Sequence, residues 1–198
     1  MHKSPLLRLQ SRYMRLLYIT ALLAGIFCAA PPAKPQALNL EGSPAEIEKL
    51  ARGKVLVLVF VRTDCPVSNR YAPTVQELSR KYAGEAVFYL VFPSKAESAE
   101  TIKEYLKAYG YALEALRDPE HALVKKSAVK VTPEAAVFDA QRKLVYHGRI
   151  NNLYVEFAKA RRAATTHELA DAIEAAHAGK RPPVDTAAGI GCFIADLK

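Results

Sequence analysis

Two long runs of apolar residues stand out along the chain and predict its central strands. Residues 55–61 read Val-Leu-Val-Leu-Val-Phe-Val, and residues 86–92 read Ala-Val-Phe-Tyr-Leu-Val-Phe. Unbroken runs of this kind, rich in β-branched and aromatic side chains, are typical of strands buried on both faces of a parallel or mixed sheet. We therefore expect a sheet that other elements cover on both sides.

Apolar positions at helical spacing predict the elements that cover this sheet. The first helix begins at Cys65-Pro66, because proline suits the first position of a helix, and it ends near Gly84. Two further helices are predicted over residues 98–109 and 167–178. The alternation of strands and helices indicates an α/β domain.

Shorter elements are predicted in the rest of the chain. They are a strand over 113–117, a helix over 121–126, an apolar strand after Val131-Thr132-Pro133, and a hairpin with its turn at 140–143 and its second strand at 144–148. Residues 151–166 fit no pattern. Residues 181–198 read as an extended, glycine-containing tail that carries Cys192.

Cys65 lies where the first predicted strand passes into the first helix. A thiol at a helix N-terminus faces the positive end of the helix dipole, which favours its ionisation, and the thiolate is the reactive form. The neighbouring cation Arg62 acts in the same direction, whereas Asp64 opposes it. Cys65 is therefore the candidate nucleophile, with a small buried hydrophobic residue as the alternative interpretation.

The strand and turn around Cys65, Phe-Val-Arg-Thr-Asp-Cys-Pro-Val-Ser over residues 60–68, resemble the active-site segment of the thioredoxin-like superfamily. The similarity is greatest to the redoxins, of the alkyl hydroperoxide reductase and thiol-specific antioxidant type, and to extracytoplasmic thioredoxin-like proteins. It returns at Val131-Thr132-Pro133, which looks like the segment in which a cis proline faces the active-site cysteine. The resemblance covers residues 42–180 and implies an α/β, three-layer thioredoxin-like fold with a central mixed β-sheet flanked by helices.

The chain departs from the family pattern at three positions. Ser68 stands where dithiol members have the second cysteine of Cys-x-x-Cys, so dithiol exchange within the motif is excluded. Val59 replaces the buried acidic or polar residue of many thioredoxins. Arg62 stands where peroxidatic members have threonine, with Thr63 one residue closer to Cys65, and this suits the thioredoxin-type turn better.

Cys192 is the candidate partner of Cys65. A cysteine in an extended tail can attack an oxidised thiol and close a disulfide, which is the role of a resolving cysteine. A static bridge and a free thiol are the alternatives, and the spacing does not establish that the tail reaches Cys65. Around Cys65 and Pro133, the following residues are expected to bind substrate or tune the thiolate: Arg62, Thr63, Pro66, Ser68, Asn69, Thr132 and Arg149. For Arg149, a surface position is the alternative.

The first 30 residues have the pattern of a secretory signal. Four basic residues and no acidic ones precede an apolar run that ends in small residues. This run of about 15 residues is shorter than the roughly 20 that span a membrane. We therefore expect cleavage after Ala30 or Ala37 and export to the periplasm or the extracellular space, with an uncleaved membrane anchor as the alternative. The proline-rich residues 31–41 read as a linker before the domain over 42–180.

Charge and spacing exclude several other functions. Four charges of the formal net charge of +8 lie in the first 30 residues, and the rest form no basic stripe with interleaved aromatic residues. Nucleic acid is therefore not an expected partner. The chain has no Cys-x-x-Cys or His-x-x-x-His spacing, so neither a metal nor another cofactor is expected.

These observations favour an exported thiol oxidoreductase in which Cys65 attacks a disulfide or an oxidant and Cys192 or an external thiol then releases it. The expected partners are a disulfide-bearing protein or a small oxidant, an external thiol reductant, and a membrane only if the N-terminal segment stays uncleaved. One alternative is a peroxiredoxin-like peroxidase with antioxidant activity, which needs a cation to assist the leaving oxygen. The other is a non-enzymatic thioredoxin-fold module that holds a partner, or a metal such as copper, through Cys65.

Overall fold

The structure is a computed structural model that describes residues 36–195 and residue 197. The predicted signal segment over residues 1–30 and the first part of the predicted linker lie outside the described residues. The described residues belong to one compact unit of the chain. None of the described helices is long and apolar enough to span a membrane.

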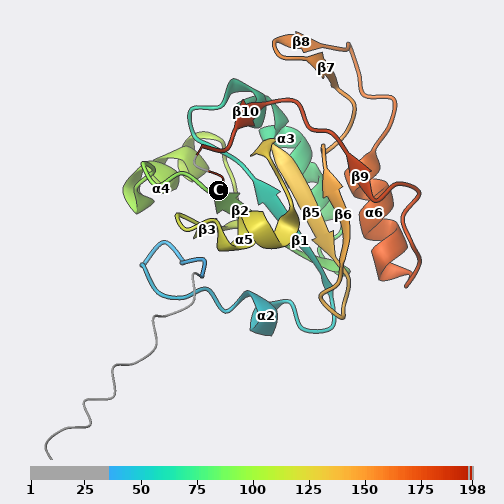
Figure 1. The fold of residues 1–198 in the computed structure, drawn as a ribbon, viewed down its shortest axis with the longest axis horizontal. Coiled ribbons are helices and arrows are strands. Elements are labelled where there is room, and N and C mark those ends of the chain that lie inside the picture. The colour runs from blue at the N-terminus through green and yellow to red at the C-terminus, as the bar shows by residue number, and fades with distance from the viewer. Residues whose placement is uncertain (1–35, 196, 198) are drawn as a thin grey trace, which may run out of the picture. The chain divides into compact units, whose positions relative to one another are not determined.

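A six-stranded mixed sheet forms the centre of the molecule (Figure 1). The strands lie in the order β3 (Glu114–Arg117), β2 (Ala86–Phe92), β1 (Val55–Phe60), β5 (Glu134–Phe138), β6 (Leu144–Gly148) and β9 (Thr186–Ala187). Strand β1 is parallel to β2 and antiparallel to β5, β2 is parallel to β3, β5 is antiparallel to β6, and β6 is parallel to β9. The two apolar runs of the sequence are thus adjacent central strands, as predicted.

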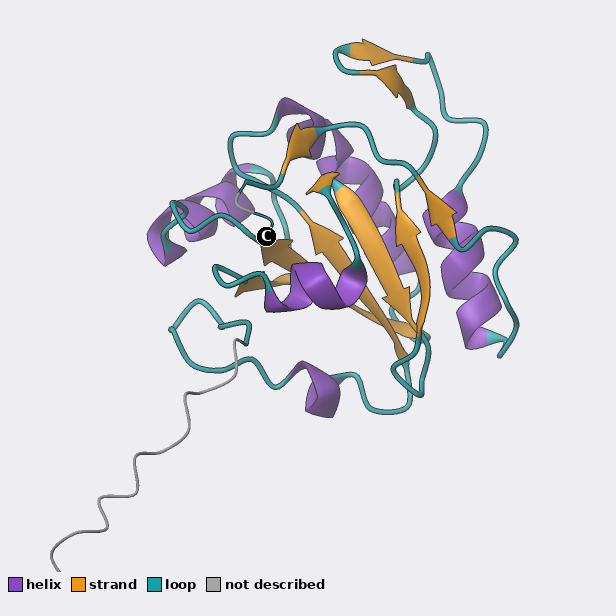
Figure 2. Cartoon of the chain, viewed as in Figure 1, coloured by secondary structure: helices purple, strands orange, loops and turns teal. Residues whose placement is uncertain are grey.

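Helices cover both faces of the sheet and give three layers (Figure 2). Helices α3 (Pro66–Lys81), α4 (Ala99–Ala108) and α6 (Glu168–His177) contribute to the core on one face. The short helices α2 (Ile47–Leu50) and α5 (Ala122–Ser127) contribute to the core on the other. The expected three-layer α/β, thioredoxin-like architecture is confirmed.

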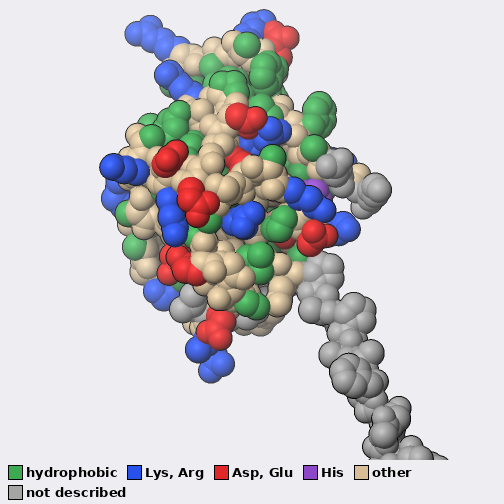
Figure 3. All heavy atoms as spheres, turned by 90° about the vertical axis from the view of Figure 1, so that its left-hand side faces the viewer, with side chains coloured by type: hydrophobic (Ala, Val, Ile, Leu, Met, Phe, Trp, Pro, Cys, Tyr) green, Lys and Arg blue, Asp and Glu red, His purple; other side chains and the backbone are tan. Residues whose placement is uncertain are grey.

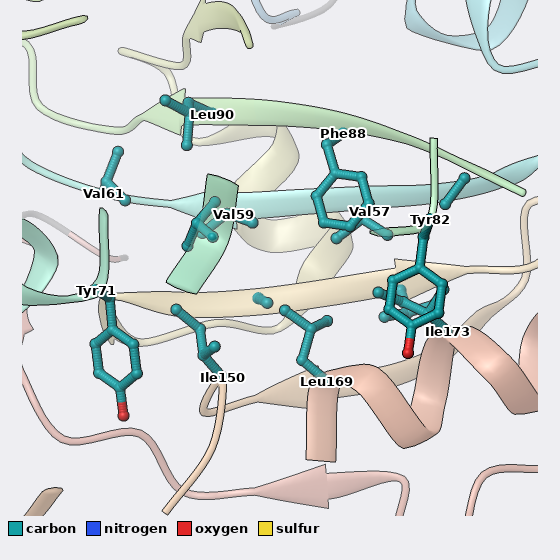
Figure 4. Close-up of a cluster of buried hydrophobic side chains, with 14 of the residues drawn as sticks. Val57, Val59, Val61, Tyr71, Tyr82, Phe88, Leu90, Ile150, Leu169 and Ile173 are labelled. Carbon is teal, nitrogen blue, oxygen red and sulfur yellow. The ribbon is translucent and has the colours of Figure 1, made fainter. Parts of the chain in front are cut away.

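Strand β1 shows why its sequence forms a central strand. Side chains alternate between the two faces of a strand, so Val57 and Val59 pack in one core while Leu56 and Leu58 pack in the other. All six residues of β1 are at most 2% exposed. Figure 4 shows Val57 and Val59 with Leu169 and Ile173 of α6, which close this core from outside the sheet.

The predicted linker over residues 31–41 ends earlier than expected. Ala37 is 4% exposed, and the backbone of Leu38 exchanges two hydrogen bonds of 2.8 Å with Arg117 at the edge strand β3. The described domain therefore includes residues 37–41. A single bridge on an edge strand has no period, so it leaves no pattern in the sequence.

Two segments in which the sequence predicted no strand also contribute strands to the fold. Residues 151–166 contain the hairpin of β7 (Tyr154–Glu156) and β8 (Lys159–Ala160), which projects from the body of the domain in Figure 1. The described part of the tail, from residue 181 to residue 195, is extended, as predicted, but it is integrated: β9 joins the central sheet, and β10 (Cys192–Phe193) pairs with β4 (Val131–Thr132). The domain thus continues beyond the predicted boundary at residue 180.

The face of the molecule in Figure 3 carries acidic and basic side chains side by side. Exposed ion pairs among the described residues include Lys95 with Glu120 at 3.2 Å and Lys103 with Glu41 at 3.7 Å. Pairs of this kind contribute little to stability because solvent screens them.

Candidate functional site

Cys65 lies at the N-cap of α3, directly after the turn that follows β1. Its backbone is extended, Pro66 occupies the first position of the helix, and the carbonyl oxygen of Cys65 accepts the Asn69 N–H at 3.0 Å. The Cys65 side chain is 0% exposed, and its thiol donates a hydrogen bond to the carbonyl oxygen of Thr132 at 3.1 Å. The predicted strand-to-helix position of this cysteine is therefore correct.

Thr132 and Pro133 face the cysteine from the other side of the site. The Thr132–Pro133 peptide bond is cis, as the resemblance implied. Thr132 is 0% exposed and Pro133 is buried, and β4 and β5 continue the chain on either side of the proline. The motif segment thus supplies a backbone carbonyl to the Cys65 thiol.

Cys192 reaches the site through the pairing of β10 with β4. This pairing is antiparallel, with Cys192 opposite Thr132 and Phe193 opposite Val131. The Thr132 hydroxyl donates to the carbonyl oxygen of Cys192 at 3.4 Å. Both cysteines are free thiols in the structure, and Cys192 is partly exposed. The tail therefore reaches Cys65, which the spacing of the cysteines in the sequence did not establish.

Gly191 makes the close approach of this strand possible. A Cβ atom at this position would lie 2.0 Å from the carbonyl oxygen of Thr132 and 3.2 Å from Cδ of Pro133. No side chain fits into such a gap. Glycine is therefore required where the tail crosses the cis-proline segment.

The two thiols differ in acidity because their surroundings shift the pKa of Cys65 and the pKa of Cys192 in opposite directions. Burial raises the pKa of Cys65, but the hydrogen bonds that its sulfur accepts from Cys192 and Ser68 outweigh burial and lower the pKa below its ordinary value. Burial also raises the pKa of Cys192, and the hydrogen bond and charge of Cys65 raise it further, to about 12. The pair therefore ionises at Cys65 first, with the proton retained on Cys192.

Ser68 and Arg62 have different roles from each other. Ser68, 0% exposed, donates toward the Cys65 sulfur and its Oγ accepts the Arg62 N–H at 3.5 Å. The Arg62 guanidinium instead pairs with Asp64 at 2.6 Å and donates to the carbonyl oxygen of Phe193 at 3.5 Å. The largest contributions that lower the Cys65 pKa come from Cys192 and Ser68, and the expected contribution of the neighbouring cation Arg62 is not among them.

Thr63, Asn69 and Pro66 belong to the turn, and among the described residues none of the three is a hydrogen-bonding partner of the Cys65 sulfur. The Thr63 N–H donates to Oε1 of Glu97 at 2.6 Å, and the Thr63 carbonyl accepts from Nδ2 of Asn69 at 3.5 Å. Pro66 is exposed. The Glu97 carboxylate, 7% exposed, is a turn-stabilising group that the sequence does not reveal, because it lies in an ordinary polar loop.

Arg149 lies beside Pro133. Its guanidinium bonds to Oε1 of Glu168, with an Nε–Oε1 distance of 3.0 Å, and the same residue lines a small cavity with Tyr71 and Pro133. Among the described residues, Cys65 is not one of its hydrogen-bonding or ion-pair partners. The structure therefore places Arg149 beside the cis proline and not at the thiol.

A second buried carboxylate that the sequence analysis missed is Glu134. It follows Pro133, is 6% exposed, and accepts backbone N–H groups from both the β4 segment and the tail. An acidic residue at the start of an otherwise apolar strand is the signal that could have identified it. Within the described part of the chain, no group of three His, Cys, Asp or Glu side chains is arranged to hold a metal ion.

Comparison with known proteins supports the fold and the family. No curated protein matches the sequence. A hypothetical protein from Sinorhizobium meliloti is 23% identical, with a TM-score of 0.67 over 79% of this chain and 87% of that one. An uncharacterised conserved protein from Geobacillus kaustophilus is 22% identical, with a TM-score of 0.68 over 86% of this chain and 93% of that one. At these identities the likeness concerns the fold alone.

The family assignment comes from the sequence model of the Redoxin family, which matches residues 29–162. This range includes β1, the turn with Cys65, helix α3 and the cis-proline segment. The match spans more than half of the chain. The chain belongs to the Redoxin family, within the thioredoxin-like superfamily.

Proposed function

We propose that the protein is a thiol oxidoreductase in which Cys65 and Cys192 cycle between a dithiol and a disulfide. The observation that supports this best is the contact between the two thiols, with the Cys65 pKa lowered and the Cys192 pKa raised to about 12. Loss of one proton from such a pair leaves a thiolate at Cys65 and a thiol at Cys192, which is what a nucleophile and its resolving partner require.

In the oxidative half of the cycle, the Cys65 thiolate attacks a small disulfide. Its sulfur bonds to one sulfur of the substrate, the S–S bond breaks, and the other sulfur leaves as a thiolate that takes up a proton. Cys192 then loses its proton to solvent and attacks the Cys65 sulfur. The Cys65–Cys192 disulfide forms, and the second half of the substrate leaves as a thiol.

Burial of the nucleophile favours a small substrate over a folded protein. Cys65 is 0% exposed, and β10 occupies the β4 edge beside it. A hydroperoxide is also small, and the same thiolate would attack its terminal oxygen, breaking the O–O bond to leave a sulfenic acid and an alcohol or water. However, Arg62 pairs with Asp64 and Arg149 with Glu168, so the charges of both arginines are already compensated. A small disulfide is therefore the preferred oxidant.

In the reductive half, an external thiolate attacks the disulfide at Cys192. Cys192 is the partly exposed sulfur, and Cys65 is the better leaving group because its pKa is the lower. The Cys65 thiolate leaves, and a mixed disulfide remains on Cys192. A second external thiol then attacks this mixed disulfide and releases Cys192, so two thiols become one external disulfide.

The place of this cycle is proposed to be outside the cytoplasm. The support is the signal-like pattern of residues 1–30, since an oxidising compartment is where such disulfides persist. N-terminal sequencing of protein from fractionated cells tests this. A mature chain that begins after Ala30 or Ala37 in the exported fraction supports export, and an intact chain among soluble cytoplasmic proteins contradicts it.

The cycle is tested by mass spectrometry of the mature protein after treatment with 2-hydroxyethyl disulfide or hydrogen peroxide, with Cys65→Ser and Cys192→Ser proteins treated in parallel. We expect a reversible Cys65–Cys192 disulfide in the wild type and a mixed disulfide on Cys65 in Cys192→Ser. Faster oxidation by the peroxide than by the disulfide would favour the peroxidase. A Cys65 that stays a thiol with both reagents would contradict an enzymatic role and favour a binding module.

A further inference from the structure

The carboxylate of Glu134 joins two segments that meet at the site. Its Oε2 accepts the N–H of Lys130 at 2.7 Å and that of Val131 at 3.3 Å, both next to or within β4. Its Oε1 accepts the N–H of Gly189, in the tail, at 3.0 Å. One side chain therefore holds the β4 segment with one oxygen and the tail with the other.

The chemistry of this carboxylate makes the link strong. A buried carboxylate is costly unless it is hydrogen-bonded, and Glu134 is 6% exposed. Its three bonds come from backbone N–H groups, and charge-assisted bonds of this kind are about twice as strong as neutral ones. Separation of the tail from β4 would leave an oxygen of this carboxylate without its donor.

Gly189 is shaped to fit this contact. A Cβ atom on Gly189 would lie 2.5 Å from Cγ and 2.7 Å from Oε1 of Glu134. Real Cβ contacts are not that short, so any side chain at position 189 would force the tail and the carboxylate apart. The glycine and the carboxylate thus form one fitted contact, three residues before Cys192.

The tail is fixed on both sides of this contact. Upstream, the Arg149 N–H donates to the carbonyl oxygen of Ala187 at 2.9 Å, where β9 joins β6. Downstream, the Ile194 N–H donates to the carbonyl oxygen of Lys130 at 3.1 Å, just after β10. The strand β10 itself has only two residues. So short a strand pairs weakly, and the Glu134 contact supplies an anchor where the pairing is weakest.

We propose that Glu134 is a positioning residue for Cys192. The Glu134 carboxylate holds β10 against β4 and so sets the effective concentration of the Cys192 thiol at Cys65. This inference rests on the proposed dithiol–disulfide cycle. The intramolecular step gains from a thiol that is held in place, because no chain entropy remains to be lost when the disulfide closes.

The test is Glu134→Gln in the full mature chain. Glutamine keeps the shape of the side chain but has one acceptor oxygen, so it cannot serve the β4 segment and the tail together. The Cys65–Cys192 disulfide is equilibrated with reduced and oxidised dithiothreitol, quenched with acid and quantified by mass. We expect the equilibrium constant for disulfide formation to fall about tenfold, the loss of roughly one charge-assisted hydrogen bond.

A second readout separates positioning from damage to the site. In a Cys192→Ser background, the rate at which 2-hydroxyethyl disulfide modifies Cys65 should not fall when the Glu134→Gln substitution is added, because that step does not need the tail cysteine and a loosened tail leaves Cys65 more open to the reagent. Gly189→Ala should lower the disulfide equilibrium constant in the same direction as Glu134→Gln, since it disturbs the same contact from the other side.

Asp118→Asn is the matched control. Asp118 is also a buried carboxylate, 0% exposed, that accepts three backbone N–H groups, from Ala122, Leu123 and Val124 at 2.8–2.9 Å. None of these donors belongs to the tail, so we expect a loss of stability with an unchanged disulfide equilibrium. An unchanged disulfide equilibrium constant in Glu134→Gln, or an equal fall of that constant in Asp118→Asn, would overturn this inference and leave the proposed function standing. A wild-type protein that forms no Cys65–Cys192 disulfide would overturn the proposed function and the inference with it.

Discussion

The thiol of Cys65 lies 3.1 Å from the carbonyl oxygen of Thr132, and Thr132 is also the residue opposite Cys192 in the pairing of β4 with β10. The backbone at Thr132 thus determines where both cysteines lie. Because a strand pair fixes its partners residue by residue, a shift of β10 by one position would turn the Cys192 side chain to the other face. The relative placement of the two sulfur atoms therefore depends on the register of two very short strands.

Ser68→Ala is expected to raise the pKa of Cys65, since it removes one of the hydrogen bonds that oppose the effect of burial. A hydrogen bond of this kind is worth about 1 kcal/mol, so alkylation by iodoacetamide near neutral pH should slow about fivefold. The rate measured against pH should rise at a higher pH than in the wild type. Ser79→Ala, on the same helix but bonded to the carbonyl of Gln76 at 2.9 Å, is the control. An equal slowing in both variants would contradict a specific role of Ser68.

Gly191→Ala is expected to displace β10, because its Cβ would lie 2.0 Å from the carbonyl oxygen of Thr132. Overpacking of this size costs about 1–3 kcal/mol, so the equilibrium constant for the Cys65–Cys192 disulfide should fall at least about fivefold. Equilibration with dithiothreitol measures this. Gly84→Ala, where a Cβ meets nothing within 4 Å, should leave the constant unchanged. A wild-type value in Gly191→Ala would show that the tail can reach Cys65 by another path.

Arg149→Met is expected to destabilise the fold by about 2 kcal/mol, because it leaves the Glu168 carboxylate, 7% exposed, without its partner. Urea unfolding at pH 7 measures this, with the exposed pair of Arg181 and Asp185 as control, where Arg181→Met should change stability by at most about 0.5 kcal/mol. The rate at which Cys65 is oxidised should stay within about twofold of the wild type, since Arg149 bonds to Glu168 and not to the thiol. A loss of Cys65 oxidation without loss of stability would place Arg149 in the reaction.

The ion pair of Arg149 and Glu168 also predicts how stability changes with pH. Burial raises the pKa of Glu168, but the hydrogen bonds from Arg149 and Thr166 outweigh it and hold the pKa below its ordinary value of 4.5. Because the pKa of Glu168 is lower in the folded than in the unfolded protein, its ionised carboxylate adds stability at a pH above the unfolded-state pKa. This stability is lost as the pH falls through the folded-state pKa. The difference in unfolding free energy between the wild type and Arg149→Met should therefore narrow as the pH falls below 4.5. A constant difference down to pH 3 would contradict this.

The oxidised protein is expected to react with an external thiol at Cys192. Cys65 is 0% exposed, whereas Cys192 is partly exposed and lies next to Phe193, which is 80% exposed. Brief treatment with 2-mercaptoethanol, acid quenching and alkylation with iodoacetamide should place the mercaptoethanol adduct on Cys192 and the alkyl group on Cys65. Extrapolation to zero time distinguishes the first attack from later exchange. The reverse placement would show that the reductant enters at Cys65.

The sequence predicted the parts of the fold that have a strong local pattern. The apolar runs of β1 and β2, the proline at the first position of α3 and the Thr132–Pro133 segment each carry their own signal, and each lies where it was expected. The placement of Cys65 at the N-terminus of α3 followed from the same signals.

The remaining features depend on contacts between distant segments and leave no periodicity. Strand β10 is two residues long, the bridge at Leu38 is a single residue, and β7 and β8 form a hairpin in a polar stretch. Arg62 was assigned to the thiolate from its distance along the chain, whereas its guanidinium turns to Asp64 and the tail. The roles of Glu97 and Glu134 arise only when the fold brings backbone N–H groups to them.

The cover over Cys65 has a consequence for the order in which the domain folds. Strand β10 lies far along the chain from Cys65 and from the strands around it, so the sheet beside Cys65 can form before β10 docks on β4. Until β10 docks, Cys65 has no Cys192 beside it and stands open to other thiols. Docking of β10 is therefore the event that converts an unguarded cysteine into a protected one, and a variant in which β10 cannot dock would leave the reactive sulfur permanently uncapped.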